Sequence, residues 1–457
     1  MPDALPPVRG LPSPAELDRI AAALGPTSRL AYAPPHIYPM SAPAFVPAIG
    51  ADRPHPGGGG ATGVYVHVPF CNYACSFCFY AKRVGDTREQ MERYTRAVVK
   101  ELDWLRPGTP LAQLYVGGGT PTVLPPDLLD TVLAAVFART TGGGVHTVEC
   151  SPESVTPAHL DVLRSRGVGR VSMGIQTLAE PVLDGVRRKH GRSEALAACD
   201  LLASSGLTVN VDLIYGLPDQ SESDFHKDFE AVAGRGVNSV TVYNLRVNER
   251  TPVGRSVKSD ERLDLARLVR WRAFVNQTAA DLGFTQTRWH LFQRLSAPAA
   301  APKPAKFEDR TGEGNQIGVG MSARSRLGGT VYRNTPDFHA YLARVEAGES
   351  PVEEVFPLGE SERKTRYVAQ TLGDGKPIDR AAFAATFGGD FDAEYGVPLR
   401  RMLAADLVAE DGDRVVLTET GKLVHDLVTL AFYPQHVRDW LREREVAAAR
   451  TGRVALA

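Results

Sequence analysis

A regular alternation of strand-like and helix-like segments between residues 63 and 245 constrains the fold of this chain more than any other feature. The strand-like runs are short, apolar and rich in β-branched residues, at 64–68, 114–117, 147–150, 170–175, 209–215 and 239–245. Patterns of helical period separate them, at 88–105, 127–139, 157–166, 193–205 and 222–234. Because strands that alternate with helices form parallel βαβ units, we predict an α/β fold with a partial (β/α)6 barrel of the TIM type. Active groups are then expected at the carboxyl ends of the strands.

The segments on either side of this alternation differ from it in composition. Residues 1–60 are rich in proline, which predicts an irregular N-terminal extension with a short helix at Pro14–Leu24 and a flexible linker at 57–60. Residues 61–350 form the predicted barrel domain, with a charged amphipathic helix at 260–282, an exposed Ala/Pro tract at 296–306 and a glycine-rich rim turn at 318–325. In residues 351–457, helical patterns at 361–372, 379–387 and 399–407 precede a hairpin-like segment at 414–422. This order predicts a C-terminal winged-helix-like domain.

The composition argues against several classes of partner. The 457 residues carry a net charge of −1, so no basic field indicates nucleic acid or an anionic membrane surface. Winged helices often bind DNA, but the acidic run at 409–413 favours a structural role or a lid over the substrate. No apolar run approaches the ~20 residues of a membrane span, and the N-terminus lacks the apolar core of a secretory signal. We therefore predict a cytoplasmic protein without a nucleic-acid or membrane partner.

Three cysteines lie close together after the first predicted strand. They are Cys71, Cys75 and Cys78, in the spacing C-x3-C-x2-C. Three thiolates so placed can hold three irons of a 4Fe–4S cubane and leave the fourth iron open for a small chelating ligand. A structural zinc site would need a fourth ligand, and the remaining cysteines, Cys150 and Cys199, stand alone and are interpreted as buried thiols. The triplet therefore predicts a cluster site.

Further motifs follow the cysteines at the ends of the predicted strands. They are GGGTPT at 117–122, ECSP at 149–152, SMGIQ at 172–176, RKH at 188–190 and DLIYGLP at 212–218. Together with the cysteine run they resemble the oxygen-independent coproporphyrinogen III oxidase-like branch of the radical S-adenosylmethionine (SAM) superfamily, over roughly residues 63–435. The resemblance implies that the amino and carboxylate groups of SAM chelate the open iron. Reductive cleavage of SAM then yields a 5′-deoxyadenosyl radical.

The resemblance also implies contacts to the methionine part of SAM. Gly118, Gly119 and Thr120 would lie near the amino group, and Glu149 would accept hydrogen bonds from the ammonium. Arg188 would pair with the carboxylate. Each of these residues has an ordinary structural interpretation too. The glycines could form a plain strand-to-helix turn, and Arg188 could be a surface cation in a basic run.

Other residues are assigned to the rest of SAM and to a second molecule of it. Gln176 and Asp212 would bind ribose hydroxyls, while Tyr65 and Phe77 would pack against the cluster and the adenine, or simply belong to the core. A further set resembles the segment that lines a second SAM pocket in the family, with a rim turn as its ordinary interpretation: Gly318, Gly320, Ser322 and Ala323. No residue is assigned to proton transfer.

Two departures from the family pattern bear on the substrate. Oxidases of this branch carry a further cysteine two residues after the third, where this chain has Tyr80, and the substrate-facing segment at 286–292 also differs. The main hypothesis is therefore a class C-type radical SAM methyltransferase or cyclopropanase. It would use two SAM molecules to modify an sp2 carbon of a planar, unsaturated natural-product scaffold, with flavodoxin or ferredoxin as electron donor.

Two alternatives keep a tetrapyrrole as the ligand. One is a coproporphyrinogen dehydrogenase-like enzyme or an anaerobic haem-degrading methyltransferase, and the proline-rich run at 32–39 resembles the substrate-gating segment of tetrapyrrole enzymes. The other is a haem chaperone that performs little SAM chemistry. The three hypotheses differ in the products that they predict from SAM.

Overall fold

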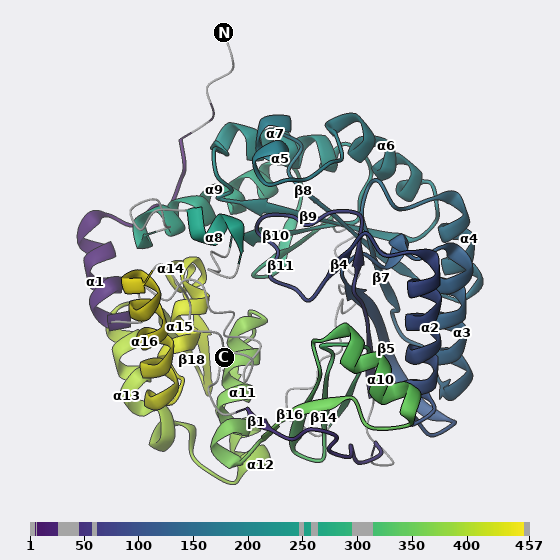
Figure 1. Cartoon of the computed structure of the whole chain (residues 1–457). Helices are drawn as coiled ribbons and strands as arrows, with labels where there is room; N and C mark the ends of the chain where they lie inside the picture. Colours follow the sequence, from purple (N-terminus) through teal and green to yellow (C-terminus); the bar gives the residue numbers. More distant parts are fainter. Residues whose placement is uncertain are drawn as a thin grey trace.

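The computed structural model describes residue 5 and residues 7–25, 45–56, 62–245, 251–256, 264–294 and 314–451. The predicted segments at 32–39, 57–60 and 296–306, and the start of the helix predicted at 260–282, lie outside these residues. Within the described part of the chain, 14 strands form one mixed sheet that curves into an open barrel (Figure 1). The α/β prediction is confirmed.

The six predicted parallel strands are all present and pair with their neighbours in chain order. They are β2 (Thr62–Val68), β5 (Thr109–Gly118), β7 (Thr147–Cys150), β8 (Arg170–Gln176), β9 (Thr208–Tyr215) and β10 (Ser239–Asn244). A seventh strand, β13 (Asn315–Val319), pairs in parallel with the other edge of β2. The predicted glycine-rich rim turn is therefore wrong in part, because its first two residues belong to β13 and only the residues between β13 and β14 form a turn.

Antiparallel strands extend the sheet at both ends. Beyond β13 lie β14 (Arg324–Leu327), β15 (Thr330–Asn334), β16 (Val352–Pro357) and β1 (Val46–Pro47), and beyond β10 lie β12 (Leu291–Gln293) and β11 (Thr285–Arg288). The short β6 (Thr140–Thr141) pairs with β5. A separate two-stranded pair, β3 (Phe70–Cys71) with β4 (Arg83–Val84), brackets the cysteine loop.

Helices cover the outer face of the sheet (Figure 1). They are α2 (Arg88–Leu102), α3 (Pro126–Arg139), α4 (Pro157–Ser165), α5 (Glu180–Gly185), α6 (Arg192–Ala203), α7 (Glu222–Ala233) and α9 (Leu265–Asp281). Two short helices, η3 (Pro121–Val123) and α8 (Pro252–Ser256), follow β5 and β10, and α10 (Phe338–Ala347) packs on α2. The apolar residues of α3 recur at helical spacing, at Leu129, Val132, Leu133 and Val136, and all four are buried against the sheet. Burying each such side chain contributes roughly 1.5–3 kcal/mol, which fixes this face of the helix inward.

The C-terminal residues form the predicted winged-helix-like module. Its elements are α11 (Glu360–Gly373), β17 (Ile378–Asp379), α12 (Arg380–Phe387), α13 (Phe391–Ala404), β18 (Val408–Asp411), β19 (Arg414–Leu417), α14 (Glu419–Leu423), α15 (His425–Ala431) and α16 (Gln435–Thr451). Helix α13 begins eight residues before the predicted 399, because Asp390 caps it and Pro398 lies inside it without ending it.

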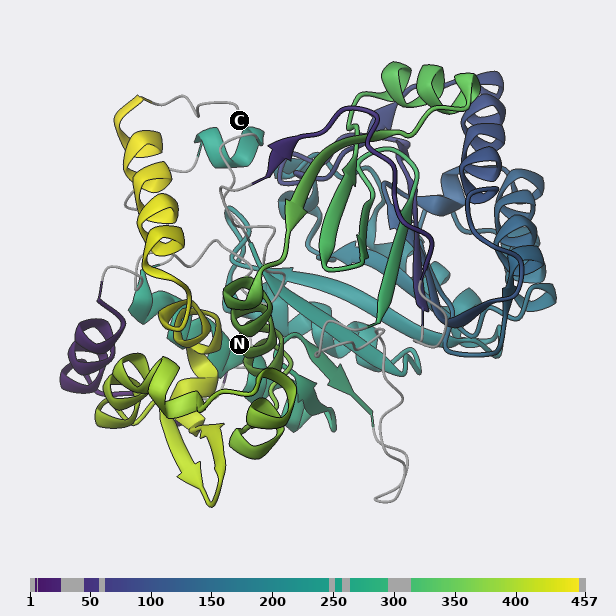
Figure 2. The ribbon, with the colours of Figure 1, turned by 90° about the horizontal axis from the view of Figure 1, so that it is seen from below.

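The N-terminal helix α1 (Pro14–Leu24) packs on α13 and α15 of this module and on α9. Its buried Ile20 and Leu24 belong to the same apolar cluster as the core of the module. In Figure 2, α1 and the module lie together on one side of the molecule, and the parallel strands lie on the other. Among the described helices, none has the length and apolarity that crossing a bilayer requires.

Candidate active site

The cysteine loop follows directly from the C-terminal end of β2. Cys71 ends β3, and Cys75 and Cys78 lie in the loop before β4. Backbone hydrogen bonds fix this loop to two neighbouring segments: the N–H of Ser76 donates to Val186 O at 3.0 Å, and its carbonyl accepts from the N–H of Val253 at 3.0 Å. All three thiols are partly exposed, so a ligand group could reach them.

The three thiols lie close enough to influence one another. Burial raises the pKa of Cys71 to about 12, and the charges of Cys78 and Cys75 would raise it further. In the described residues, no three His, Cys, Asp or Glu side chains converge on a single metal ion. A cubane cluster makes a different demand, since each thiolate binds a different iron and the thiols stay farther apart. Three cysteine thiols in one loop are a donor set that fits a 4Fe–4S cluster.

The glycine run at the end of β5 packs directly beneath the cysteine loop. Gly119 N–H donates to Val68 O at 2.7 Å, and Thr120 N–H donates to Phe70 O at 2.8 Å. A Cβ at Gly119 would lie 2.6 Å from Phe70 O, and Gly118 has a φ of 115°, which disfavours any side chain. The same contacts bring Thr120 Oγ1 to 3.9 Å from Cys71 Sγ.

Glu149 carries a buried carboxylate on the adjacent strand. It accepts hydrogen bonds from Tyr115 OH at 2.7 Å and from the N–H of Gly118 at 3.1 Å. Burial raises the pKa of this carboxyl to about 7, and the nearby Asp212 raises it as well. The group is therefore poised between its neutral and ionised forms near neutral pH, as expected where a cationic ligand binds.

Asp212 and Gln176 lie on the next two strands, β9 and β8. Asp212 accepts from Asn210 Nδ2 at 2.8 Å and from Ser172 Oγ at 3.3 Å, and burial raises its pKa. Gln176 ends β8 with a φ of 75°, which is uncommon for a residue with a side chain. Backbone strain of this kind concentrates at functional sites, which agrees with the predicted place of Gln176 near a ligand.

Arg188 is buried beside the cysteine loop, so the alternative of a surface cation is wrong. Its exposed fraction is 8%, whereas Arg187 and Lys189 on either side are exposed. The guanidinium donates to Cys75 Sγ at 3.5 Å, to Gly174 O and, through Nε, to His190 Nδ1 at 3.3 Å. Burial lowers the pKa of His190 to about 3, so this imidazole is neutral and accepts that hydrogen bond.

The two predicted aromatic residues have different surroundings. Phe77 is partly buried and packs against a small apolar cluster at the ends of β9 and β10. Tyr65 lies in β2 with its hydroxyl 3.0 Å from His67 Nδ1. The other ring nitrogen of His67 lies 2.9 Å from Ala81 O, and burial lowers its pKa to about 4. His67 is therefore a neutral core histidine with both ring nitrogens bonded.

The four residues of the predicted second SAM pocket surround the turn between β13 and β14. The N–H of Gly318 donates to Ser325 Oγ at 3.0 Å, that of Gly320 to Glu101 Oε2 at 2.8 Å, and that of Ser322 to Thr335 O at 2.9 Å. Ala323 is buried. Since protein groups satisfy these three donors, the turn is held rigidly beside Tyr65, which is the register partner of Gly318.

A pocket of about 650 Å³ opens between the barrel interior and the C-terminal module. Asp212, Ser172 and Tyr115 line it from the barrel, and residues 288–291 and 373–374 line it from the β11–β12 turn and the end of α11. It also contains two arginines that the sequence motifs did not indicate, Arg170 and Arg288. Arg170 could have been predicted from the sequence. It lies two residues before Ser172 in β8, and residues two apart in a strand share a face, so both face the barrel interior.

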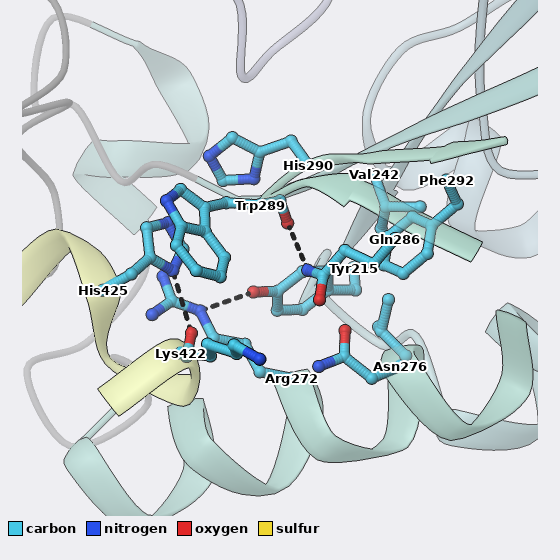
Figure 3. Close-up of a pocket in the computed structure, with 11 residues that line it drawn as sticks. Tyr215, Val242, Arg272, Asn276, Gln286, Trp289, His290, Phe292, Lys422 and His425 are labelled. Carbon is cyan, nitrogen blue, oxygen red and sulfur yellow. Dashed lines mark hydrogen bonds between the residues drawn. The ribbon is translucent and has the colours of Figure 1, made fainter. Parts of the chain in front are cut away.

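A second pocket, of about 310 Å³, marks the seam where the module meets the barrel (Figure 3). Here Arg272 of α9 donates to Asp426 at 2.7 Å and 2.8 Å and to Leu423 O at 2.8 Å. Trp289 stacks on His425 with ring centroids 4.7 Å apart. These contacts fix the β11–β12 turn, which also lines the larger pocket, to the module.

Comparison with known proteins agrees with this arrangement. Residues 65–232 match the radical SAM superfamily, and residues 375–424 match the HemN C-terminal domain. The chain is similar to the heme chaperone HemW of Mycobacterium tuberculosis, with 30% identity over 381 residues that span 80% of this chain and 93% of that protein. It is also similar to the oxygen-independent coproporphyrinogen III oxidase of Paracoccus denitrificans, with 26% identity over 86% of this chain and 92% of that protein.

A solved structure supports the fold. The coproporphyrinogen III oxidase (HemN) of Escherichia coli, described as a radical SAM enzyme, superimposes with a TM-score of 0.70 over 82% of this chain and 90% of that one, at 21% identity.

Proposed function

Because the chain belongs to the branch of the radical SAM superfamily that contains HemW-type heme chaperones and oxygen-independent coproporphyrinogen III oxidases, we propose that it is a radical SAM enzyme that acts on a tetrapyrrole. This reverses the order of the hypotheses drawn from the sequence. The full-length relatives named above favour a tetrapyrrole ligand over a natural-product scaffold.

The proposal assigns the cluster to Cys71, Cys75 and Cys78. A 4Fe–4S cluster bound there, with SAM on its open iron and an electron from a donor such as flavodoxin or ferredoxin, supplies a 5′-deoxyadenosyl radical. Thr120 lies beside Cys71, and the Arg188 guanidinium lies beside Cys75. Arg188 is therefore placed to neutralise part of the negative charge that the thiolates and the SAM carboxylate bring together.

The strand ends hold the remaining parts of SAM in this proposal. Glu149, whose position is fixed by Tyr115 and Gly118, accepts the SAM ammonium. Asp212 and Gln176 accept hydroxyls of the ribose, Gly119 provides room for the methionine chain, and Tyr65 and Phe77 contact the adenine. Because these groups lie on rigid strands, SAM is oriented before the electron arrives.

One observation carries the choice of a tetrapyrrole. The larger pocket reaches from Asp212 to the C-terminal module and contains the cations Arg170 and Arg288, of which Arg288 lies 3.6 Å from Asp374. A tetrapyrrole with propionate side chains offers a wide apolar ring for such a pocket and carboxylates for its arginines. A substrate that enters here lies next to the proposed ribose site.

The experiment is product analysis with anaerobically reconstituted protein, SAM, dithionite and coproporphyrinogen III. Formation of 5′-deoxyadenosine and methionine with consumption of coproporphyrinogen would support an oxidase-like enzyme, and tight haem binding without SAM cleavage would favour a haem chaperone. The variant with all three of Cys71, Cys75 and Cys78 changed to Ala is the matched control and should lose iron and SAM cleavage together. Neither tetrapyrrole binding nor SAM cleavage in the cluster-loaded protein would refute the proposal.

Methyl transfer with a second SAM is the second candidate. It is favoured by Tyr80, which stands where the oxidases that the sequence resembles carry a further cysteine. Tyr80 and Phe79 are exposed and stacked, with ring centroids 4.7 Å apart, so an aromatic surface replaces that thiol. S-Adenosylhomocysteine formed in equal amounts with 5′-deoxyadenosine would identify this reaction in the same assay.

A further inference from the structure

Arg324, the first residue of β14, carries a charge that nothing in the described part of the chain neutralises by direct contact. Arg324 is half-buried, and its Nε is inaccessible to solvent and makes no hydrogen bond with the described residues. Two buried arginines elsewhere in the fold have direct acidic partners: Arg53 pairs with Glu101 at 2.8 Å, and Arg272 pairs with Asp426 at 2.7 Å. The Nε of Arg326, on the same strand as Arg324, also makes no hydrogen bond. A buried cation without a partner is costly, so Arg324 needs an explanation that Arg53 and Arg272 do not.

The surroundings of Arg324 increase this cost. Arg333 lies directly opposite it on β15, and like charges in register across two strands repel. The nearby carboxylate, Glu354, already binds Arg333 at 2.7 Å. Burial, followed by the charge of Arg333, lowers the pKa of Arg324 to about 10. Glu354 therefore contacts Arg333, and among the described residues no carboxylate contacts Arg324.

Arg324 also lies at the proposed SAM site. Tyr65 is the register partner of Gly318 on β13, and β13 pairs with β14, which begins at Arg324. Burial raises the pKa of Tyr65 well above its usual value, so its hydroxyl is neutral. A Cβ on Gly318 would lie only 2.3 Å from the backbone of Arg324, so the chain folds back tightly at this point. The hydrogen-bonded turn at 320–323 directly precedes Arg324 in the chain. The turn amides are occupied, which leaves the Arg324 guanidinium as the unused donor there.

We propose that Arg324 binds a carboxylate of a ligand in a subsite that it forms with Tyr65 and the turn at 320–323. The inference rests on the proposed function and adds to it the chemical group that this part of the site recognises. A guanidinium presents parallel N–H donors that match the two oxygens of a carboxylate. Two sources carry this group: the methionine part of a second SAM molecule and an acidic side chain of the tetrapyrrole.

The test compares wild-type protein with Arg324→Gln in the cluster-loaded state. Two probes distinguish the sources: the number of SAM molecules bound, by equilibrium dialysis, and the affinities for coproporphyrin III and its tetramethyl ester, by fluorescence titration. We expect Arg324→Gln to weaken binding of one acidic probe about 10- to 100-fold, the range of a buried charge-assisted hydrogen bond. Loss of a second SAM equivalent identifies SAM as the source. Weaker binding of the porphyrin acid, but not of its ester, identifies the substrate.

Further variants separate recognition from folding. Arg324→Lys should restore part of the affinity, and Arg324→Gln should melt no lower than wild type without ligand, because it removes an unpaired charge. Arg333→Gln is the matched control. Equal weakening of ligand binding in Arg324→Gln and Arg333→Gln, or unchanged binding of both probes by Arg324→Gln, would overturn the proposal for Arg324. The proposed function would not be affected by either result. Wild-type protein that bound neither SAM nor porphyrin would remove the proposed function, and this inference with it.

Discussion

Glu149 should make SAM binding depend on pH in the range where its carboxyl titrates. Burial raises its pKa to about 7 in the protein without ligand, and only the ionised form can accept the SAM ammonium in a charge-assisted hydrogen bond. Binding that needs the ionised form weakens by a factor of 1 + 10^(pKa − pH). This factor is about 1.3 at pH 7.5 and about 11 at pH 6.0, so the Kd for SAM should rise about eightfold between them.

The assay is equilibrium dialysis of SAM with cluster-loaded protein at both pH values. Glu149→Gln keeps the size of the side chain and removes its titration, so it should bind SAM weakly and with the same Kd at pH 6.0 and pH 7.5. An eightfold change that persists in Glu149→Gln would assign the titration to another group. An unchanged Kd in the wild type would refute the reasoning about the ionised carboxylate.

Titration of Glu149 should also change the stability of the protein with pH, and this change tests whether Glu149→Gln is folded. Its folded pKa of about 7 exceeds the ordinary value of 4.5, so the native state holds the proton more tightly than the unfolded state. Ionisation therefore destabilises the protein as pH rises from about 4.5 to 7, by about 3 kcal/mol in total. Glu149→Gln should consequently unfold at a higher temperature than wild type at pH 8, and this difference should vanish near pH 4.5.

Three further outcomes follow from the structure. Asp212→Asn should weaken SAM binding about tenfold or more in dialysis without loss of iron, and an unchanged Kd would remove this residue from the ribose site. Gly118→Ala should destabilise the protein by about 2–4 kcal/mol in denaturant unfolding, because its φ is 115° and a Cβ there would lie 2.5 Å from a buried imidazole. Gly143→Ala is the control. An added Cβ at Gly143 would have no atom within 4 Å, so this variant should change the free energy of unfolding by less than ~0.5 kcal/mol. Asp426→Asn should cost about 3–5 kcal/mol in the same assay, since it leaves Arg272 buried without its partner. Burial raises the pKa of Asp426, but the charge of Arg272 lowers it by more, so the net pKa lies below the ordinary value. The ion pair between Asp426 and Arg272 therefore stabilises the protein above about pH 4, and this stabilisation declines at lower pH.

The sequence predicted the parallel strands well because each is a short apolar run that is buried on both faces. It did not predict β13, whose residues Asn315–Val319 are too few and too mixed to stand out, and whose place in the sheet depends on pairing with β2 far away in the chain. It also placed the start of α13 too late. Pro398 disfavours a helix locally, yet the buried Phe391, Leu399 and Met402 on one face keep the helix continuous through it.

The site residues divide in a similar way. Those that the sequence indicated lie at strand ends in motifs, where local patterning is enough to identify them. Arg170 belongs to no sequence motif and becomes notable only because packing places it in the polar pocket. Arg324 lies in the glycine-rich segment at 318–325, but only the structure shows that its Nε has no hydrogen-bond partner among the described residues. Arg188 is an intermediate case. Its basic neighbours make it resemble a surface residue, and only the fold shows that it alone turns inward to Cys75.

The structural and functional interpretations of the glycine run describe the same contact. Gly119 must lack a side chain because its backbone passes within hydrogen-bonding distance of Val68, just before the cysteine loop. That close approach places Thr120 beside Cys71 and points the N–H of Gly118 at Glu149. Packing alone does not explain why the Glu149 carboxylate, with a pKa of about 7, lies against this turn. The pairing of β2 with β5 therefore also joins the proposed cluster ligands to the proposed SAM ligands.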